Sequence, residues 1–121
     1  MVLIADDNSA IRLLVSATLA SDQYTTLEAA DGEEAWRLIR KHHPAVAILD
    51  WQMPVYSGLE LAAVIKGDPQ VCDIIVIMLT GRITPADRRA GARAQVDLYL
   101  TKPFSPQELL DAVEKALGVN Q

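Results

Sequence analysis

Short apolar runs alternate with longer amphipathic stretches along the whole chain. Three runs are continuously apolar, at 2–5, 45–49 and 74–79, and two more, at 24–29 and 96–100, are mixed. Runs of this length and composition are typical of strands that are buried on both faces of a parallel sheet. The pattern therefore predicts five strands at these positions.

The stretches between the strands have helical periodicity. Apolar residues three or four positions apart lie on one face of a helix. This spacing is present in Ile11, Leu14, Val15 and Leu19, and again in Leu109, Val113 and Leu117. We therefore expect each of these sets to form the buried face of a helix.

Four helix starts carry a capping signal, because an N-cap side chain stands three residues before a carboxylate. The N-cap residues are Asp31, Ser57, Thr84 and Ser105, and proline follows the last two at the first helical position. Five strand–helix units in succession predict a parallel sheet with helices on both sides.

The fourth helical stretch, 84–95, is the least well specified. It has few large apolar residues and contains Gly91 in its interior. An interior glycine costs about 1 kcal/mol relative to alanine. We expect this helix to be the most mobile of the five.

Composition narrows the class of protein. The chain has 121 residues, half of them apolar, and a formal net charge of −5. This length suits one domain, and we expect residues 1–121 to form it. The acidic balance argues against a surface that coats nucleic acid and against a polybasic membrane anchor.

No apolar run is long enough to cross a bilayer, and carboxylates at Asp6 and Asp7 fit no signal peptide. A single cysteine, Cys72, excludes an internal disulfide and a multi-cysteine metal site. We expect a cytoplasmic protein in which Cys72 is a partly buried, reduced thiol.

The candidate chemistry lies at the carboxyl ends of the predicted strands. Asp6 and Asp7 follow the first strand, Asp50 ends the third, Thr80 ends the fourth and Lys102 follows the fifth. Ligands of open parallel α/β sheets bind outside these ends. Side chains far apart in the sequence are therefore expected to meet in one crevice.

The charges of this group point to a metal and a phosphoryl group. Three carboxylates repel one another, and one lysine cannot balance them. A divalent cation with oxygen ligands can, and Mg2+ fits best because it takes few carboxylates and keeps waters. A carboxylate beside it can attack phosphorus. Lys102 and the metal can neutralise the transferred group, and the Thr80 hydroxyl can donate to one of its oxygens.

The same segments resemble a known family. The matching motifs are Ala5-Asp6-Asp7-Asn8, Asp50-Trp51-Gln52-Met53-Pro54, Gly58-Leu59-Glu60-Leu61, Thr80-Gly81 and Tyr99-Leu100-Thr101-Lys102-Pro103-Phe104. In this order they resemble the receiver domain of bacterial response regulators. The resemblance implies a three-layer, doubly wound, flavodoxin-like α/β fold with strand order 2-1-3-4-5 and five helices.

The resemblance also assigns roles to residues. Asp50 corresponds to the phosphoacceptor, Lys102 to the lysine that binds the phosphoryl group and Thr80 to the switch hydroxyl. Tyr99 corresponds to the switch aromatic, which moves inward once Thr80 moves toward the phosphoryl group.

The implied metal set is Asp7 as a direct ligand of Mg2+, Asp6 through water, Asp50, and the backbone carbonyl of Gln52. Two positions of the family tune the phosphoryl lifetime, and Gln52 and Arg82 occupy them here. The Lys102–Pro103 peptide bond is expected to be cis. Gln95 stands where the family commonly has glycine, so a left-handed backbone there would carry a side chain.

The implied function is a phosphorylation-activated switch in two-component signalling, not a conventional enzyme. A histidine kinase or histidine phosphotransfer protein would donate the phosphoryl group to Asp50. The surface of the fourth helix, fifth strand and fifth helix would control a downstream protein or output domain, with no direct contact to nucleic acid or membrane. Two alternatives remain, a phosphorylation-independent interaction module of this fold and an aspartyl-phosphate phosphohydrolase.

Overall fold

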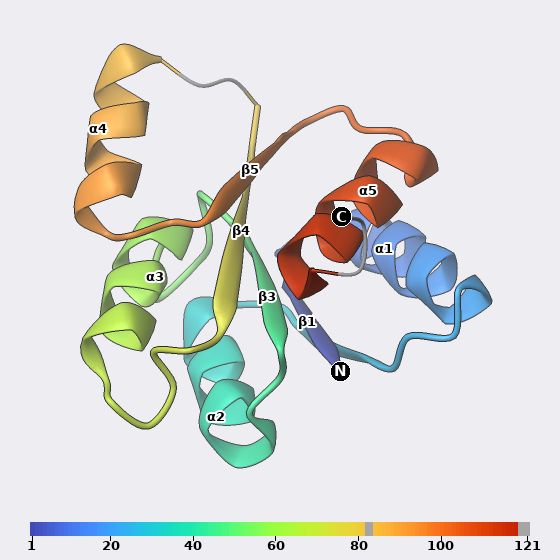
Figure 1. Cartoon of the computed structure of the whole chain (residues 1–121), viewed down its shortest axis with the longest axis horizontal. Coiled ribbons are helices and arrows are strands. Elements are labelled where there is room, and N and C mark those ends of the chain that lie inside the picture. The colour runs from blue at the N-terminus through green and yellow to red at the C-terminus, as the bar shows by residue number, and fades with distance from the viewer. Residues whose placement is uncertain (82–83, 119–121) are drawn as a thin grey trace.

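A computed structural model describes residues 1–81 and 84–118 of the chain, and five strands alternate with five helices along it (Figure 1). The strands are β1 Val2–Ala5, β2 Thr26–Ala29, β3 Val46–Asp50, β4 Ile75–Thr80 and β5 Leu98–Thr101. The helices are α1 Ser9–Ser21, α2 Gly32–His42, α3 Gly58–Gly67, α4 Pro85–Arg93 and α5 Pro106–Leu117. Each predicted strand and helix is therefore present, with ends that differ by one or two residues.

The strands form one parallel sheet in the order β2-β1-β3-β4-β5. Helices α1 and α5 cover one face of the sheet, and α2, α3 and α4 cover the other (Figure 1). The predicted three-layer architecture and strand order are confirmed.

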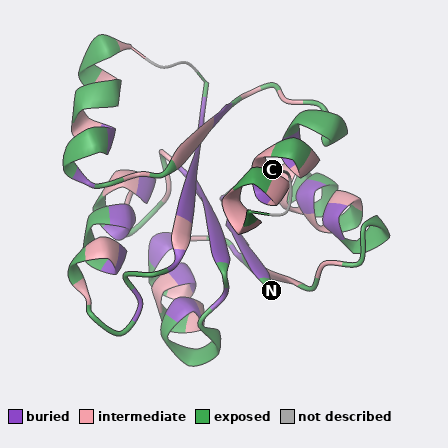
Figure 2. Ribbon diagram, viewed as in Figure 1, coloured by how far each residue is buried: buried purple, intermediate pink, exposed green. Residues whose placement is uncertain are grey.

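Each face of the sheet has its own hydrophobic core, because successive side chains of a strand point to opposite faces. Leu3 and Ala5 of β1 pack toward α2 and α3, whereas Val2 and Ile4 pack toward α1 and α5. The central strands are buried on both faces, and the helices expose their outer sides (Figure 2). The continuous apolar runs of the sequence are explained by this double burial.

The helix starts are capped as predicted. Ser57, Thr84 and Ser105 each accept a hydrogen bond from the backbone three residues later and form complete capping boxes. Asp31 accepts from the backbone N–H of Glu34, and the Glu34 side chain accepts from Ala30. These caps fix where each helix begins after its loop.

Two burial predictions are wrong. Cys72 is exposed, because it lies in the turn between α3 and β4, where Val71 and Ile74 take the buried positions. Leu14 is 41% exposed, whereas Val15 and Leu19 are fully buried. The face of α1 that meets the sheet is therefore narrower than the apolar spacing predicts.

The Lys102–Pro103 peptide bond is cis, which confirms the prediction. Gln95 has φ 63°, so a left-handed backbone carries a side chain at this position. Within residues 1–81 and 84–118, no helix has both the length and the apolar character needed to cross a membrane. The mobility of α4 stays a prediction.

Candidate functional site

A polar pocket lies where the loops after β1, β3, β4 and β5 meet, at the carboxyl edge of the sheet. Its volume is about 650 Å³. The lining residues are Asp7, Asp50, Trp51, Gln52, Thr80, Gly81, Asp87 and Lys102. The crevice expected from the strand ends is therefore formed by residues from four separate segments.

Three carboxylates meet at this pocket. Asp6, Asp7 and Asp50 each offer an oxygen, and these oxygens lie within 4.8 Å of one another. Asp6 is fully buried and Asp50 is 8% exposed, whereas Asp7 faces solvent. The cluster thus has a buried floor and one carboxylate at its mouth.

Lys102 supplies the positive charge next to the two buried carboxylates. Its Nζ lies 3.0 Å from Oδ2 of Asp6 and 3.3 Å from Oδ1 of Asp50. The lysine side chain is itself largely shielded from solvent. One ammonium group therefore faces two carboxylates, and the third carboxylate, Asp7, adds to the negative excess.

This environment changes the proton affinity of Asp50 and Lys102. Burial, helped by the negative charge of Asp6, raises the pKa of Asp50, although the contact with Lys102 opposes the change. Burial alone would lower the pKa of Lys102, but the two carboxylates outweigh it and raise that pKa. Lys102 therefore stays charged at neutral pH, while the ionised form of Asp50 is disfavoured.

The donor set suits a divalent cation. Oδ2 of Asp6 is buried, and its contact with Lys102 is an ion pair rather than a well-directed hydrogen bond. Hard cations prefer carboxylate and carbonyl oxygens, and Mg2+ tolerates a small protein ligand set completed by water. The residues present therefore fit Mg2+.

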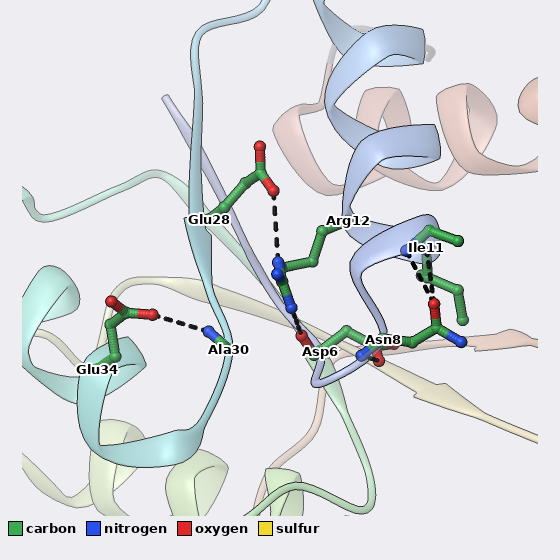
Figure 3. A network of polar contacts seen from close by, with 8 residues as sticks. Asp6, Asn8, Ile11, Arg12, Glu28, Ala30 and Glu34 are labelled. Atoms are coloured by element: carbon green, nitrogen blue, oxygen red, sulfur yellow. Dashed lines mark hydrogen bonds and ion pairs between the residues drawn. The ribbon is translucent and has the colours of Figure 1, made fainter.

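The turn after β1 is held from two sides (Figure 3). Asn8 caps α1 through its side chain, and its backbone N–H donates to Oδ1 of Asp6 at 2.9 Å. Arg12 of α1 donates from Nη1 to the backbone carbonyl of Asp6 at 2.7 Å, and its Nε lies 3.4 Å from Glu28 of β2. Arg12 and Glu28 were not predicted, since nothing in the local sequence pattern links a helix arginine to the preceding aspartate.

The other predicted site residues lie as follows. Thr80 ends β4 at the pocket, and the backbone N–H of Gln52 hydrogen-bonds to the carboxylate of Asp50. Tyr99 does not line the pocket and instead lies against α4. Arg82 lies outside the described residues. Asp87 joins the lining although the sequence indicated only its capping role.

A doubly wound sheet with an acidic pocket and a lysine at its carboxyl edge is the architecture of a receiver domain. Residues 2–114 match the response regulator receiver domain family, and the chain belongs to this family, whose members act in two-component signalling.

Relatives are similar over nearly the whole chain. Chemotaxis protein CheY1 of Helicobacter pylori is 36% identical over 121 residues, which cover 98% of both proteins. The phosphate regulon transcriptional regulatory protein PhoB of Pseudomonas aeruginosa is 37% identical over 116 residues, or 96% of this chain. The chain spans about half (51%) of PhoB.

Solved structures agree with this assignment. Chemotaxis protein CheY4 of Vibrio cholerae has a TM-score of 0.91 at 34% identity, covering 95% of this chain and 96% of that one. The receiver domain of sensor histidine kinase PA1611 from Pseudomonas aeruginosa has a TM-score of 0.87 at 26% identity, covering 97% and 96%. That structure has a magnesium ion coordinated in its active site cleft.

Proposed function

We propose that the chain is a phosphorylation-activated switch that accepts a phosphoryl group on Asp50. The observation that carries the proposal is the position of Lys102 Nζ, 3.0 Å from Asp6 and 3.3 Å from Asp50, beside a cluster of three carboxylates. Because the Lys102 ammonium group already contacts both Asp50 and Asp6, it can also bind the negatively charged oxygens of an incoming phosphoryl group. A structural ion pair alone would not need the third carboxylate or the open pocket.

In the proposed reaction a carboxylate oxygen of Asp50 attacks the phosphorus of a phosphohistidine donor. The new O–P bond forms as the P–N bond breaks, and the released imidazole keeps the electron pair and takes up a proton. Lys102 binds an equatorial oxygen of the transferred group, and the Thr80 hydroxyl donates to another. Water reverses the modification by attacking phosphorus: the O–P bond to Asp50 breaks, inorganic phosphate leaves and the Asp50 carboxylate is restored.

Mg2+ would be held by Asp7, Asp50, the backbone carbonyl of Gln52 and, through water, Asp6, and it would neutralise charge on the transferring oxygens. The buried Asp6 carboxylate lies beside Lys102 and fixes the ammonium group in the pocket. The exposed position of Asp7 leaves it open to an incoming cation. Gln52 and Arg82 are proposed to tune the lifetime of the phosphorylated state.

The proposal extends to partners and location. The donor is a histidine kinase or histidine phosphotransfer protein, and the surface of α4, β5 and α5 acts on a downstream protein or output domain. We propose a cytoplasmic protein with no direct contact to nucleic acid or membrane, in which residues 1–121 form one receiver domain. The chain catalyses only its own modification and is not a conventional enzyme.

Mass spectrometry of the intact protein tests the proposal. Acetyl phosphate with Mg2+ should add one phosphoryl group to the wild type and to Asp73→Asn, which lacks an exposed carboxylate outside the pocket. The modification should be absent in Asp50→Asn and in a chelator. Modification of Asp50→Asn would contradict the assignment, an unmodified wild type would favour the interaction module, and steady turnover of phosphate esters would favour a phosphohydrolase.

A further inference from the structure

Gly91 lies in the middle of α4, where glycine is a poor choice for a helix. The residue is buried. A Cβ atom at this position would overlap the hydroxyl oxygen of Tyr99 and would lie 2.8 Å from its Cζ atom and 3.4 Å from Cε1. The end of the Tyr99 ring, from β5, thus occupies the space that a side chain at position 91 would fill.

Tyr99 reaches α4 because of its register in the sheet. Tyr99 is paired with Met78, and Thr101 is paired with Thr80. Residues two apart in a strand point to the same face, so the side chains of Tyr99 and Thr80 both leave the sheet on the face that α4 covers. Tyr99 therefore lies on the strand next to that of Thr80, two residues before the residue that pairs with Thr80.

The ring is held from more than one side. Tyr99 packs against the core under α2, α3 and α4, and the guanidinium carbon of Arg88 lies 5.9 Å from its ring centre. This distance is within the range of a cation–π contact. Gly91 and Arg88 lie one helical turn apart on α4, so both contact the tyrosine from one side of the helix.

Gly91 differs from the other tightly packed glycines of the described chain. A Cβ at Gly32 or Gly58 would strike backbone atoms of Tyr56 or Asp50, which cannot move without moving the main chain of a loop or of β3. At Gly91 the obstacle is the end of a side chain that can rotate. A larger residue at position 91 would therefore displace the ring of Tyr99 rather than unfold the helix.

We propose that Gly91 is the positioning residue of Tyr99, which keeps open the place on α4 that the tyrosine ring occupies. The receiver family implies that Tyr99 moves in response to Thr80, and in this arrangement a methyl group at position 91 would stop the ring from passing such a movement on to α4. The packing half of the inference, that Gly91 makes room for the ring of Tyr99, stands alone. The relay half, that Tyr99 passes a movement of Thr80 on to α4, rests on the proposed function.

A double-mutant cycle of melting temperatures tests the packing half. In a Tyr99→Ala background, Gly91→Ala should raise the melting temperature by about 3–5 °C, the gain of alanine over glycine inside a helix of a domain this size. In the presence of Tyr99 most of this gain should be lost. Gly67→Ala, where a Cβ meets nothing within 4 Å, should act equally in both backgrounds. An equal effect of Gly91→Ala in both backgrounds would overturn the proposal.

NMR of the tyrosine ring carbons tests where Tyr99 goes. Burial raises the pKa of Tyr99, so in Gly91→Ala this tyrosine should ionise at lower pH than in the wild type, while Tyr24 should be unchanged. An unchanged titration of Tyr99 would contradict displacement of the ring.

The relay half is measured by adding acetyl phosphate and Mg2+ to both proteins. Amide signals of α4 should shift in the wild type and respond less in Gly91→Ala, although both become phosphorylated. An equal response would overturn the relay. Failure of both proteins to become phosphorylated would instead overturn the proposed function and leave the cycle and the titration as tests of the packing.

Discussion

Val55 has a backbone conformation that a β-branched side chain rarely adopts. Its φ is 71°, in the left-handed region, and its side chain is 61% exposed, so no burial compensates for the strain. It lies in the loop between Asp50 and α3, beside the candidate site. The strain is therefore carried by the segment that also holds Gln52.

Replacing Val55 with glycine should stabilise the fold by about 1 kcal/mol, because glycine adopts positive φ without steric cost. The melting temperature is expected to rise by about 3–5 °C. The same change at Val64, an exposed position inside α3, should instead lower it, because glycine is a poorer helix former than valine. A loss of stability at both positions would show that the loop does not strain Val55.

The raised pKa of Asp50 predicts that its ionised form lowers the stability of the unmodified protein at neutral pH. Its pKa is raised above the ordinary 3.8, so the folded state holds more protons than the unfolded state between these two values. Stability from this group therefore falls as pH rises through that window, and the cost is complete above it.

Without Mg2+, Asp50→Asn should melt a few degrees higher than the wild type at pH 7, and the difference should vanish below about pH 3.8. Thermal melts across pH measure this, with Asp73→Asn as the control for loss of an exposed carboxylate. A variant that is less stable at pH 7 would mean that the pairing with Lys102 outweighs burial.

At the scale of elements, Arg12 ties α1 to the end of β1 and to β2. Its bond to the carbonyl of Asp6 fixes the turn that carries the cluster, and its contact with Glu28 fixes the guanidinium. Groups that orient metal ligands typically change metal affinity by ten- to a hundredfold when removed.

Arg12→Met should therefore weaken Mg2+ binding by roughly tenfold, whereas Glu28→Gln should change it by less than about threefold, because the carbonyl contact remains. Titration of Trp51 fluorescence, at the edge of the pocket, gives the affinity. Equal affinities for wild type and Arg12→Met would show that the turn needs no support from α1.

The elements themselves could be predicted because their signals are local. Continuous apolar runs predicted three of the strands and mixed runs the other two, and the Ser57, Thr84 and Ser105 capping boxes predicted three helix starts. The carboxyl-edge site followed from the parallel topology. The exposure of Leu14 could not be predicted, since apolar spacing along a helix does not show how much of that face the neighbouring elements cover.

Contacts between distant elements also escaped prediction. The Arg12 contact with Asp6, and the ion pair of Lys66 with Asp97 at 2.8 Å, join residues with no shared sequence pattern. The reason for Gly91 was equally hidden, because the sequence shows the cost of glycine in α4 but not the tyrosine that fills its place.

At the scale of the whole molecule, Mg2+ should stabilise the fold. Only the folded chain brings Asp6, Asp7 and Asp50 within 4.8 Å, and a ligand that binds only the folded state adds about 2.7 kcal/mol at one hundred times its dissociation constant. The melting temperature should rise with Mg2+ concentration and saturate. The same melting curve in Mg2+ and in NaCl of equal ionic strength would contradict a metal site.

The central claim is that modification of Asp50 changes a surface beyond the pocket. Backbone amide spectra before and after treatment with acetyl phosphate and Mg2+ test it most directly, with Asp50→Asn treated in the same way. We predict shifts that extend from Thr80 through Tyr99 and Gly91 along α4 and reverse as the phosphoryl group is lost. Shifts confined to the lining of the pocket, or identical shifts in Asp50→Asn, would contradict a phosphorylation-activated switch.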